Sequence, residues 1–300
     1  KFCTNVKRFF LRYSTDSLRS LGLVHMKICN GIYFLCGLEG ANIGIVRGDG
    51  EVALVDAGWT DETVELILSY LSLVTDLEEL RYVLVTHSDR DHIGGLSRLQ
   101  NDFNVEIVVN ELDAGKISDP LPPITPSRPD VTYKEKRRLI VGDVELELIP
   151  TPGHTPGSTC IYYRKHSLLF TGDVVMPPFF HARHNRIIQV PIVRGSFDTY
   201  TASLRQLAKL EVDWLLPGHG MPIRNGNRRI DEYITVTSTV LEKALDLLKD
   251  ELTPSELAEK LNAFPTMGPR IINELERKGK IMKTGVKTIL QEPLYCQKRI

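Results

Sequence analysis

The chain has 300 residues, 42% hydrophobic and 25% charged, which is ordinary for a globular protein with one large domain or a main domain and a smaller one. The 37 Lys and Arg residues nearly balance the 38 Asp and Glu residues, so the overall charge gives no argument for a nucleic-acid or membrane partner. No apolar run approaches the roughly 20 residues of a membrane-spanning helix. Five scattered cysteines without a CxxC pair disfavour a disulfide framework and favour a reducing compartment, so we expect a cytoplasmic location.

Residues 1–25 are basic and lack the apolar core of a secretory signal. We expect them to form a disordered N-terminal extension ahead of a natural start at Met26. Their composition also leaves an organelle presequence open.

From Met26 onward, short apolar runs predict β-strands that glycine-containing turns separate. We expect strands at 32–35, 43–46, 52–55 and 82–86, and helices at 61–73 and from Gly94 onward. In the helix expected at 61–73, the apolar residues recur at a spacing that places them on one face.

A proline-rich segment at residues 118–130 predicts a surface loop. Beyond it we expect strands at 138–141, 144–149, 159–163, 168–170 and 213–216, and a helix at 197–210. This mixture favours an α/β protein of the α+β type, with two sheets and helices on the outside, over a single parallel sheet.

Residues 231–300 change character, so we place a domain boundary after residue 230. Helices are expected at 231–249, 254–261 and 268–278. Thr253-Pro254-Ser255-Glu256 predicts a capping box with proline at the first helical position. A β-hairpin around Gly285 would complete a small winged-helix-like module.

This C-terminal module is basic, with nine Lys and Arg residues against five Asp and Glu residues from Thr253 to the end. The cations on its second helix and hairpin are Arg270, Arg277, Lys278, Lys280, Lys283 and Lys287. They could contact the phosphate backbone of RNA. We favour the alternative, a solvated face on a module that packs against the first domain or supports a homodimer.

The segment His87-Ser88-Asp89-Arg90-Asp91-His92 directly follows an expected strand. Alternate residues of an extended chain point the same way, so His87, Asp89 and Asp91 should converge on one point. His92 should turn toward a second point as a helix begins. Burying these carboxylates together would be costly without a cation, and nitrogen and oxygen ligands suit zinc, iron or manganese.

Three later loops each follow a strand and each offer a ligand-type residue. His154 lies in the turn-rich segment 152–157, Asp173 ends a strand, and His219 lies between two glycines. Strand ends that share one rim are where a fold collects a site, so we expect these residues to join the first cluster.

The sequence resembles the metallo-β-lactamase superfamily over about residues 26–225, through the motifs just described and Leu54-Val55-Asp56-Ala57-Gly58. The resemblance implies a four-layer αββα sandwich as the catalytic domain, 26–230, and two divalent metal ions. It implies one metal site of His87, Asp89 and His154 and a second of Asp91, His92 and His219, with Asp173 bridging them. Asp56 would orient ligands from outside. The C-terminal module resembles the tail of the branch near glyoxalase II, some of whose members cut RNA.

Asp89 departs from the commonest pattern, because most members of the superfamily have histidine there. The carboxylate adds negative charge and a hard oxygen ligand, which improves the case for iron or manganese. Zinc remains our first expectation, with the identity of the metal left open.

A two-metal site of this kind predicts a hydrolase that uses a metal-bridging hydroxide, with Asp91 as the catalytic residue in proton transfer. We expect a small ester, thioester or lactone substrate. The alternatives are a metal-dependent endoribonuclease or phosphodiesterase, and a non-enzymatic nucleic-acid-binding protein with a vestigial metal site. Asp173 and His219 lie too close in sequence for an inserted nuclease clamp domain.

Aromatic residues, His181, His184 and several arginines including Arg194 lie between residues 177 and 194. This stretch could hold an anionic substrate, or it could be an ordinary surface loop. We do not expect His181 or His184 to be metal ligands.

Overall fold

Two β-sheets pack face to face in the computed structural model, which describes residues 23–181, 186–287 and 292–297. The first sheet has the strand order β1 (Val24–Cys29), β2 (Ile32–Cys36), β3 (Ile43–Arg47), β4 (Val52–Val55), β5 (Leu80–Leu84), β6 (Glu106–Asn110) and β7 (Val131–Tyr133). Its strands are antiparallel from β1 to β4 and parallel from β4 to β7.

The second sheet is mostly antiparallel. Its order is β15 (Ile223–Arg224), β14 (Trp214–Pro217), β11 (Leu168–Gly172), β10 (Thr159–Tyr163), β9 (Val144–Pro150) and β8 (Arg137–Val141). Only β11 and β14 run parallel, and both end on the same side of the sheet. Two short hairpins complete the strands, β12 (Phe179–His181) with β13 (Arg186–Ile188), and β16 (Ile281–Lys287) with β17 (Glu292–Gln297).

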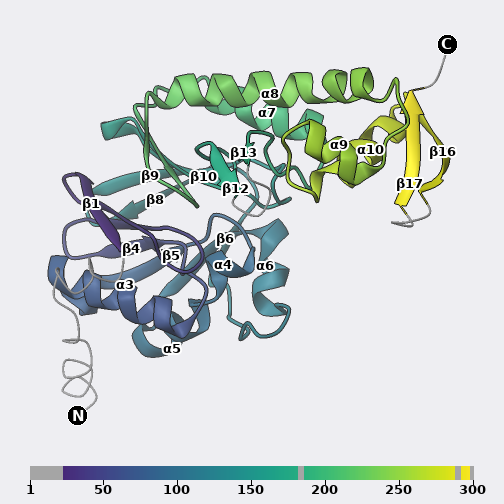
Figure 1. Cartoon of the computed structure of the whole chain (residues 1–300). Helices are drawn as coiled ribbons and strands as arrows, with labels where there is room; N and C mark the ends of the chain where they lie inside the picture. Colours follow the sequence, from purple (N-terminus) through teal and green to yellow (C-terminus); the bar gives the residue numbers. More distant parts are fainter. Residues whose placement is uncertain (1–22, 182–185, 288–291, 298–300) are drawn as a thin grey trace.

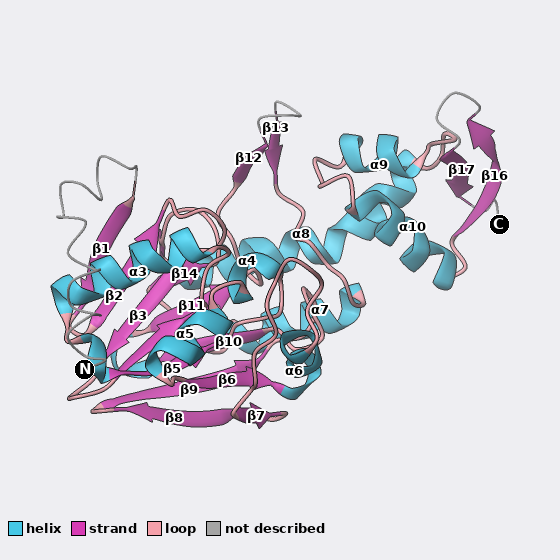
Figure 2. Cartoon of the chain, turned by 90° about the horizontal axis from the view of Figure 1, so that it is seen from below, coloured by secondary structure: helices cyan, strands magenta, loops and turns pink. Residues whose placement is uncertain are grey.

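Helices cover the outer face of each sheet, as Figures 1 and 2 show. The first sheet carries α3 (Asp61–Val74), α4 (Arg90–Ile93), α5 (Leu96–Phe103) and α6 (Glu111–Ser118). The second carries α7 (Phe197–Leu207) and α8 (Gly226–Leu247), followed by α9 (Pro254–Lys260) and α10 (Met267–Arg277). Two short 3-10 helices, η1 (Leu77–Glu79) and η2 (Arg164–His166), lie in connections. The predicted four-layer αββα sandwich is confirmed.

Three buried apolar clusters hold the layers together. One joins α3 and α5 to the first sheet, and a second, which includes Phe34 and Phe170, fills the space between the sheets. The third joins α7 and α8 to the second sheet and continues without a break into α9 and α10 through Leu257, Met267 and Ile271. Because this core is continuous, the C-terminal helices are fixed to the rest of the molecule by hydrophobic burial.

Two elements begin earlier in the structure than the sequence predicted. Strand β1 begins at Val24, before the expected start at Met26, because these residues pair with β2. Helix α8 begins at Gly226, so the boundary that we placed after residue 230 falls inside a continuous helix. The segment 1–22 lies outside the described residues.

The C-terminal module consists of α9, α10 and the hairpin β16–β17, which extend beyond the sandwich at the end of α8 (Figures 1 and 2). The capping box is present, since the Thr253 hydroxyl accepts from the Glu256 amide and the Glu256 carboxylate accepts from the Thr253 amide. The predicted hairpin is present, but its predicted turn at Gly285 was wrong. Gly285 lies inside β16 at a register shift, because the chain continues to pair with β17 as far as Lys287.

None of the helices in the described part of the chain is both long enough and apolar enough to cross a membrane.

Candidate metal centre

The segment 87–92 leaves the first sheet after β5 and becomes helical at Arg90, where α4 begins. Asp89 is the last extended residue, with φ −71° and ψ 146°. The expectation that His87, Asp89 and Asp91 would converge on one point is therefore wrong for Asp91. Alternation of side chains ends where the helix starts, and the helical turn carries Asp91 away together with His92.

The first group of side chains consists of His87, Asp89, His154 and Asp173, whose ligand atoms lie within 4.8 Å of one another. Nε2 of His87 and Nε2 of His154 lie 3.5 and 3.2 Å from Oδ2 of Asp89. His154 comes from the loop between β9 and β10, so both sheets contribute to this group.

The second group consists of Asp91, His92 and His219. Oδ2 of Asp91 lies 3.1 Å from Nε2 of His219 and 3.9 Å from Nε2 of His92. His219 follows β14, whose end lies beside the end of β11 because these two strands are parallel.

Asp173, directly after β11, stands between the two groups. Its Oδ2 is 3.7 Å from Nε2 of His154 and 3.6 Å from Nε2 of His219, and its Oδ1 is 3.6 Å from Nε2 of His92. The backbone at position 218 lies so close to Asp173 and His92 that it requires glycine, because a Cβ there would lie 2.4 Å from Asp173 Oδ1 and 2.7 Å from His92 Cε1. All seven residues singled out in the sequence thus meet at one rim of the sandwich.

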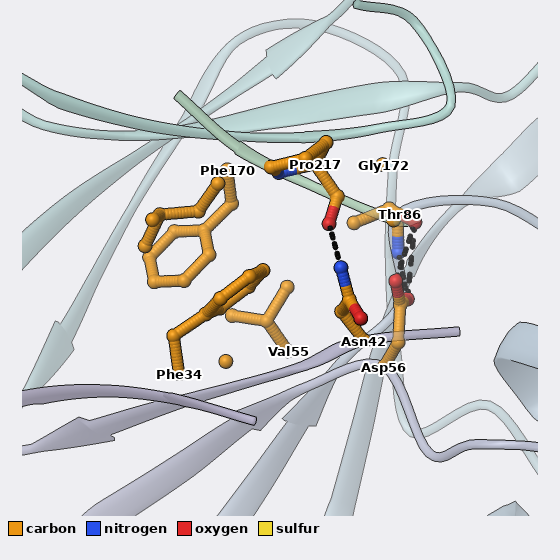
Figure 3. A pocket seen from close by; sticks show the side chains of 11 residues that line it. Phe34, Asn42, Val55, Asp56, Thr86, Phe170, Gly172 and Pro217 are labelled. Carbon is orange, nitrogen blue, oxygen red and sulfur yellow. Dashed lines mark hydrogen bonds between the residues drawn. The ribbon is translucent and has the colours of Figure 1, made fainter. Parts of the chain in front are cut away.

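Asp56 contacts His92 directly and His87 through Thr86, and Figure 3 shows the contact between Asp56 and Thr86. Thr86 donates its amide to Oδ1 of Asp56 at 2.8 Å and its hydroxyl to Oδ2 at 2.8 Å, and Nδ1 of His92 lies 2.8 Å from the same Oδ2. The Thr86 hydroxyl is also 3.0 Å from Nδ1 of His87. Since that hydroxyl donates to Asp56, it can accept from His87, so in the neutral form of each ring Nε2 of His87 and of His92 carries no proton and is directed into the groups. Burial lowers the pKa of His92, but Asp56 and Asp173 outweigh burial and raise that pKa well above its usual value.

Asp56 adopts a left-handed backbone, with φ 66°, that is unusual for a residue other than glycine. Such a conformation costs on the order of 1–3 kcal/mol and persists where surrounding contacts enforce it. Here the enforcing contacts are the hydrogen bonds to Thr86 and His92. Nearby, the Asn42 side chain donates to the carbonyl of Pro217 at 3.0 Å, which ties the first sheet to the end of β14 (Figure 3).

Arg194 was noted in the sequence only as one cation of a loop, whereas the structure pairs it with Asp89. Both guanidinium nitrogens Nη1 and Nη2 bond the carboxylate, the second at 2.5 Å from Oδ2. The neighbouring residue Ile192 accepts from Nδ1 of His154 at 3.0 Å, which fixes that ring as well. No pattern in the sequence indicated either contact, because the residues are far apart along the chain.

Asp113, at the start of α6, was missed entirely by sequence reasoning. Its buried carboxylate accepts from the amide of Ser88 at 2.9 Å, from the hydroxyl of Thr155 at 2.7 Å and from the amide of Gly157 at 3.1 Å. It therefore joins the loop that carries His87 and Asp89 to the loop that carries His154. A lone aspartate in a helix gave no signal of this role.

The electrostatics of the two groups favour a bound cation. Burial raises the pKa of Asp173, but His92, His219 and His154 outweigh it and hold the pKa well below its usual range. Burial likewise opposes ionisation of Asp89 and Asp91, yet their histidine partners, and Arg194 for Asp89, lower both pKa values. The result is three ionised carboxylates around one small volume.

The donor set also fits metal ions. Nε2 of His87, Nε2 of His92 and Oδ1 of Asp173 are buried and have no hydrogen-bond partner among the described residues. Burial lowers the pKa of His87, which keeps its imidazole neutral, as a metal ligand must be. Unsatisfied buried donors and acceptors are costly, and divalent ions would satisfy all three atoms.

A family model described as the metallo-beta-lactamase superfamily matches residues 36–219, a span that contains every residue of both groups. The chain belongs to the metallo-beta-lactamase superfamily. The match confirms the predicted superfamily and supports the predicted enzyme class, a hydrolase.

Several curated relatives are similar at moderate identity. The Caenorhabditis elegans beta-lactamase-like protein 2 homolog is 24% identical over 75% of this chain and 72% of its own length. An uncharacterized protein of Aquifex aeolicus is 32% identical over 42% of this chain and 60% of its own length. Thioesterase pkgB of Emericella nidulans is 28% identical over 66% of this chain, and the match spans only 51% of that relative.

Two solved structures share the fold. A metallo-beta-lactamase family protein of Thermus thermophilus superposes with a TM-score of 0.72 at 20% identity, over 91% of this chain and 100% of the other. A beta-lactamase domain protein of Burkholderia ambifaria gives 0.70 at 17% identity, over 91% and 93% of the two chains. Both matches extend over most of the chain, beyond the span of the family model.

The aromatic and basic stretch at 177–194 is described in part. Residues 182–185, which include Arg183 and His184, lie outside the described residues, as does the side chain of His181. Arg194, whose side chain is described, lies beside Asp89 of the first group.

Proposed function

We propose that the chain is a metal-dependent hydrolase that cleaves a small ester, thioester or lactone at a pair of divalent metal ions. The observation that carries the proposal is the position of Asp173, whose carboxylate lies between two groups of ligand-type side chains and contacts histidines of both. One carboxylate shared by two adjacent groups is the arrangement expected for a two-metal site.

Under this proposal His87, Asp89 and His154 would hold one ion, Asp91, His92 and His219 would hold the other, and Asp173 would contribute to both. When bound, such a metal pair supplies an activated water and polarises the bond under attack. The protein's contribution is to fix the histidine tautomers through Thr86, Asp56 and Ile192, and to exclude water from the buried side of the site.

Asp91 is our candidate for proton transfer. Its side chain is 29% exposed, whereas His92 beside it is fully buried, so Asp91 faces the open side of the site. Its carboxylate is ionised at neutral pH because His219 and His92 outweigh the effect of burial on its pKa. An ionised, partly exposed oxygen can accept a proton and release it to solvent.

Two observations support a small ester or thioester as the substrate. One is the names of the relatives, and the other is that cations of the C-terminal module are paired within the protein. Relatives named as thioesterases, pkgB and an atrochrysone carboxyl ACP thioesterase of Aspergillus fumigatus, support a thioester or ester. The alternative of an RNA-binding surface stays less favoured, because Arg277 pairs with Glu274 at 2.7 Å and Lys278 with Asp198 at 3.1 Å. Cations that are neutralised within the protein contribute less to a phosphate-binding surface. RNA binding, a winged-helix role and a homodimer stay predictions.

The test is the metal content of the full chain purified without added metal, measured by elemental analysis alongside turnover of an ester, thioester and lactone panel. We expect about two ions per chain, and turnover that a chelator abolishes and added metal restores. Zinc is our first expectation, with iron or manganese favoured by the oxygen ligand Asp89. Protein that takes up no metal and hydrolyses no substrate would contradict the proposal and favour a vestigial site.

A further inference from the structure

A short strap, Gln189–Gly195, connects the candidate metal centre to the C-terminal module. At one end, the amides of Arg194 and Gly195 donate to the carbonyl of Gly153, and His154 contacts Ile192. At the other end, the amide of Gln189 donates to the carbonyl of Asn262, which lies between α9 and α10. The strap also contributes Val190 and Val193 to the apolar cluster that contains the α10 residues Ile271 and Ile272. Helix α10 is therefore packed against the segment that carries Arg194.

Arg270 is the α10 cation that faces this strap. Its Nη1 donates to the carbonyl of Val193 at 3.4 Å, next to Arg194 in the chain. The next two cations along the chain, Arg277 at the end of α10 and Lys278 directly after it, pair with Glu274 and Asp198. Arg270, in contrast, forms no ion pair with any of the carboxylates whose side chains the structure describes.

The surroundings of Arg270 disfavour its charge. Partial burial lowers the pKa of its guanidinium, and the positive charge of Arg194 lowers it further. Two cations held near each other by the fold, one of them without a carboxylate partner, are a cost that an anionic ligand would remove. If metal ions occupy the site, their charge exceeds that of the three carboxylates around them, and the attraction for an anion increases.

Arg194 is suited to reach such an anion. Its side chain is 33% exposed and uses Nη1 and Nη2 to bond Asp89, so Nε and the outer edge of the guanidinium remain for other contacts. Guanidinium groups bind carboxylate and phosphate through paired hydrogen bonds. The anion would then lie beside the candidate metal centre, at the surface formed by the strap and the first turn of α10.

We propose that Arg270 and Arg194 together bind an anionic group of the substrate, a phosphate or a carboxylate, and that the C-terminal module thereby forms part of the substrate site. The inference rests on the proposed hydrolase function and deepens it. It assigns Arg270 a role in substrate selection and none in the chemical step.

The kinetic test compares three thioesters with the same acyl group: a coenzyme A thioester, which carries phosphates, a glutathione thioester, which carries carboxylates, and a neutral N-acetylcysteamine thioester. Arg270→Gln should lower kcat/KM for one of the anionic thioesters by about tenfold, through KM, and leave the neutral one unchanged. Lys280→Ala removes an exposed cation of the same module and should change neither. The anionic substrate that responds identifies the anion as phosphate or carboxylate. Equal losses on all three substrates, or no loss, would overturn the inference and leave the hydrolase proposal standing.

A binding measurement separates the two proposals. Calorimetry with the full-length chain as purified would use S-alkyl thioethers of coenzyme A and glutathione, which cannot be hydrolysed. We expect the wild type and Lys280→Ala to bind one of them, Arg270→Gln to bind about tenfold more weakly, and Arg270→Lys to recover part of the affinity. This pattern without any turnover would contradict the hydrolase function and keep the anion site. Binding of neither thioether by the wild type would overturn the anion site.

Discussion

Arg194 forms a two-point ion pair with Asp89, the residue that replaces the histidine found at this position in most of the superfamily. Relative to a neutral histidine, Asp89 adds a negative charge to the first group, and Arg194 returns a positive one. The carboxylate at position 89 and the guanidinium that pairs with it are therefore linked, because the charge of one compensates the charge of the other.

Changing Asp89 to histidine should shift metal preference toward zinc, because an imidazole nitrogen replaces a carboxylate oxygen. The measurement is competitive uptake of zinc, iron and manganese by the wild type and Asp89→His, followed by elemental analysis. A double variant with Arg194→Gln controls for the cation that loses its partner. Unchanged metal selectivity would show that Asp89 is not a ligand of the metal.

Asp173→Ala should lose both metal ions and activity together, because its carboxylate lies between the two groups. The matched control is Asp246→Ala, which removes an exposed carboxylate of α8 that pairs with Lys249 and should retain both metals. Activity that survives in Asp173→Ala would exclude a binuclear mechanism.

Asp56→Asn should weaken metal binding by about 10–100-fold without removing a ligand, because Asp56 fixes the His92 ring. The amide can still accept from Thr86, so the fold should survive. Metal affinity is measured by competition with a chromogenic chelator, and far-ultraviolet circular dichroism checks the fold. Wild-type affinity would mean that His92 keeps its orientation without this carboxylate.

Asp113→Ala should destabilise the fold by roughly 3 kcal/mol or more, because it leaves several buried donors without an acceptor, each worth about 1–3 kcal/mol. Urea unfolding of chelator-treated protein measures the change apart from metal binding. Glu111→Ala, on the same helix but partly exposed, should cost far less. Equal effects of the two substitutions would contradict the role assigned to Asp113.

Glu147 should make folding sensitive to acid. Burial raises its pKa, but the ion pairs with Lys136 and Arg164 outweigh burial and hold the pKa below its usual value. A lowered folded-state pKa contributes stability above the unfolded-state value, about 4.3, and that contribution is lost as the pH falls toward the folded-state pKa. Glu147→Gln should flatten this part of the stability curve, as unfolding midpoints from pH 6 to pH 3 would reveal. A slope identical to that of the wild type would assign the acid sensitivity to other carboxylates.

Local sequence patterns predicted most of the secondary structure of this protein and the residue types of its candidate metal centre. The short apolar runs predicted most strands to within a few residues, and the Thr253 capping box located the start of α9, because strand alternation and helix capping depend on neighbours in the chain. The residue types of the metal centre were also evident, since histidines and carboxylates after strand ends are a local signature. Both sheets and the αββα order follow from these elements and the family resemblance.

Only the tertiary structure decided how those residues are paired. The helical turn at Arg90 separated Asp91 from Asp89, the shared ends of β11 and β14 placed Asp173 between the groups, and the strap brought Arg194 to Asp89 across 105 positions. Asp113 and Arg270 likewise meet their hydrogen-bond partners in loops that are distant in the sequence. The sequence shows which groups each side chain can donate or accept. Which partner each side chain contacts depends on the tertiary structure, which the packing of the buried core fixes.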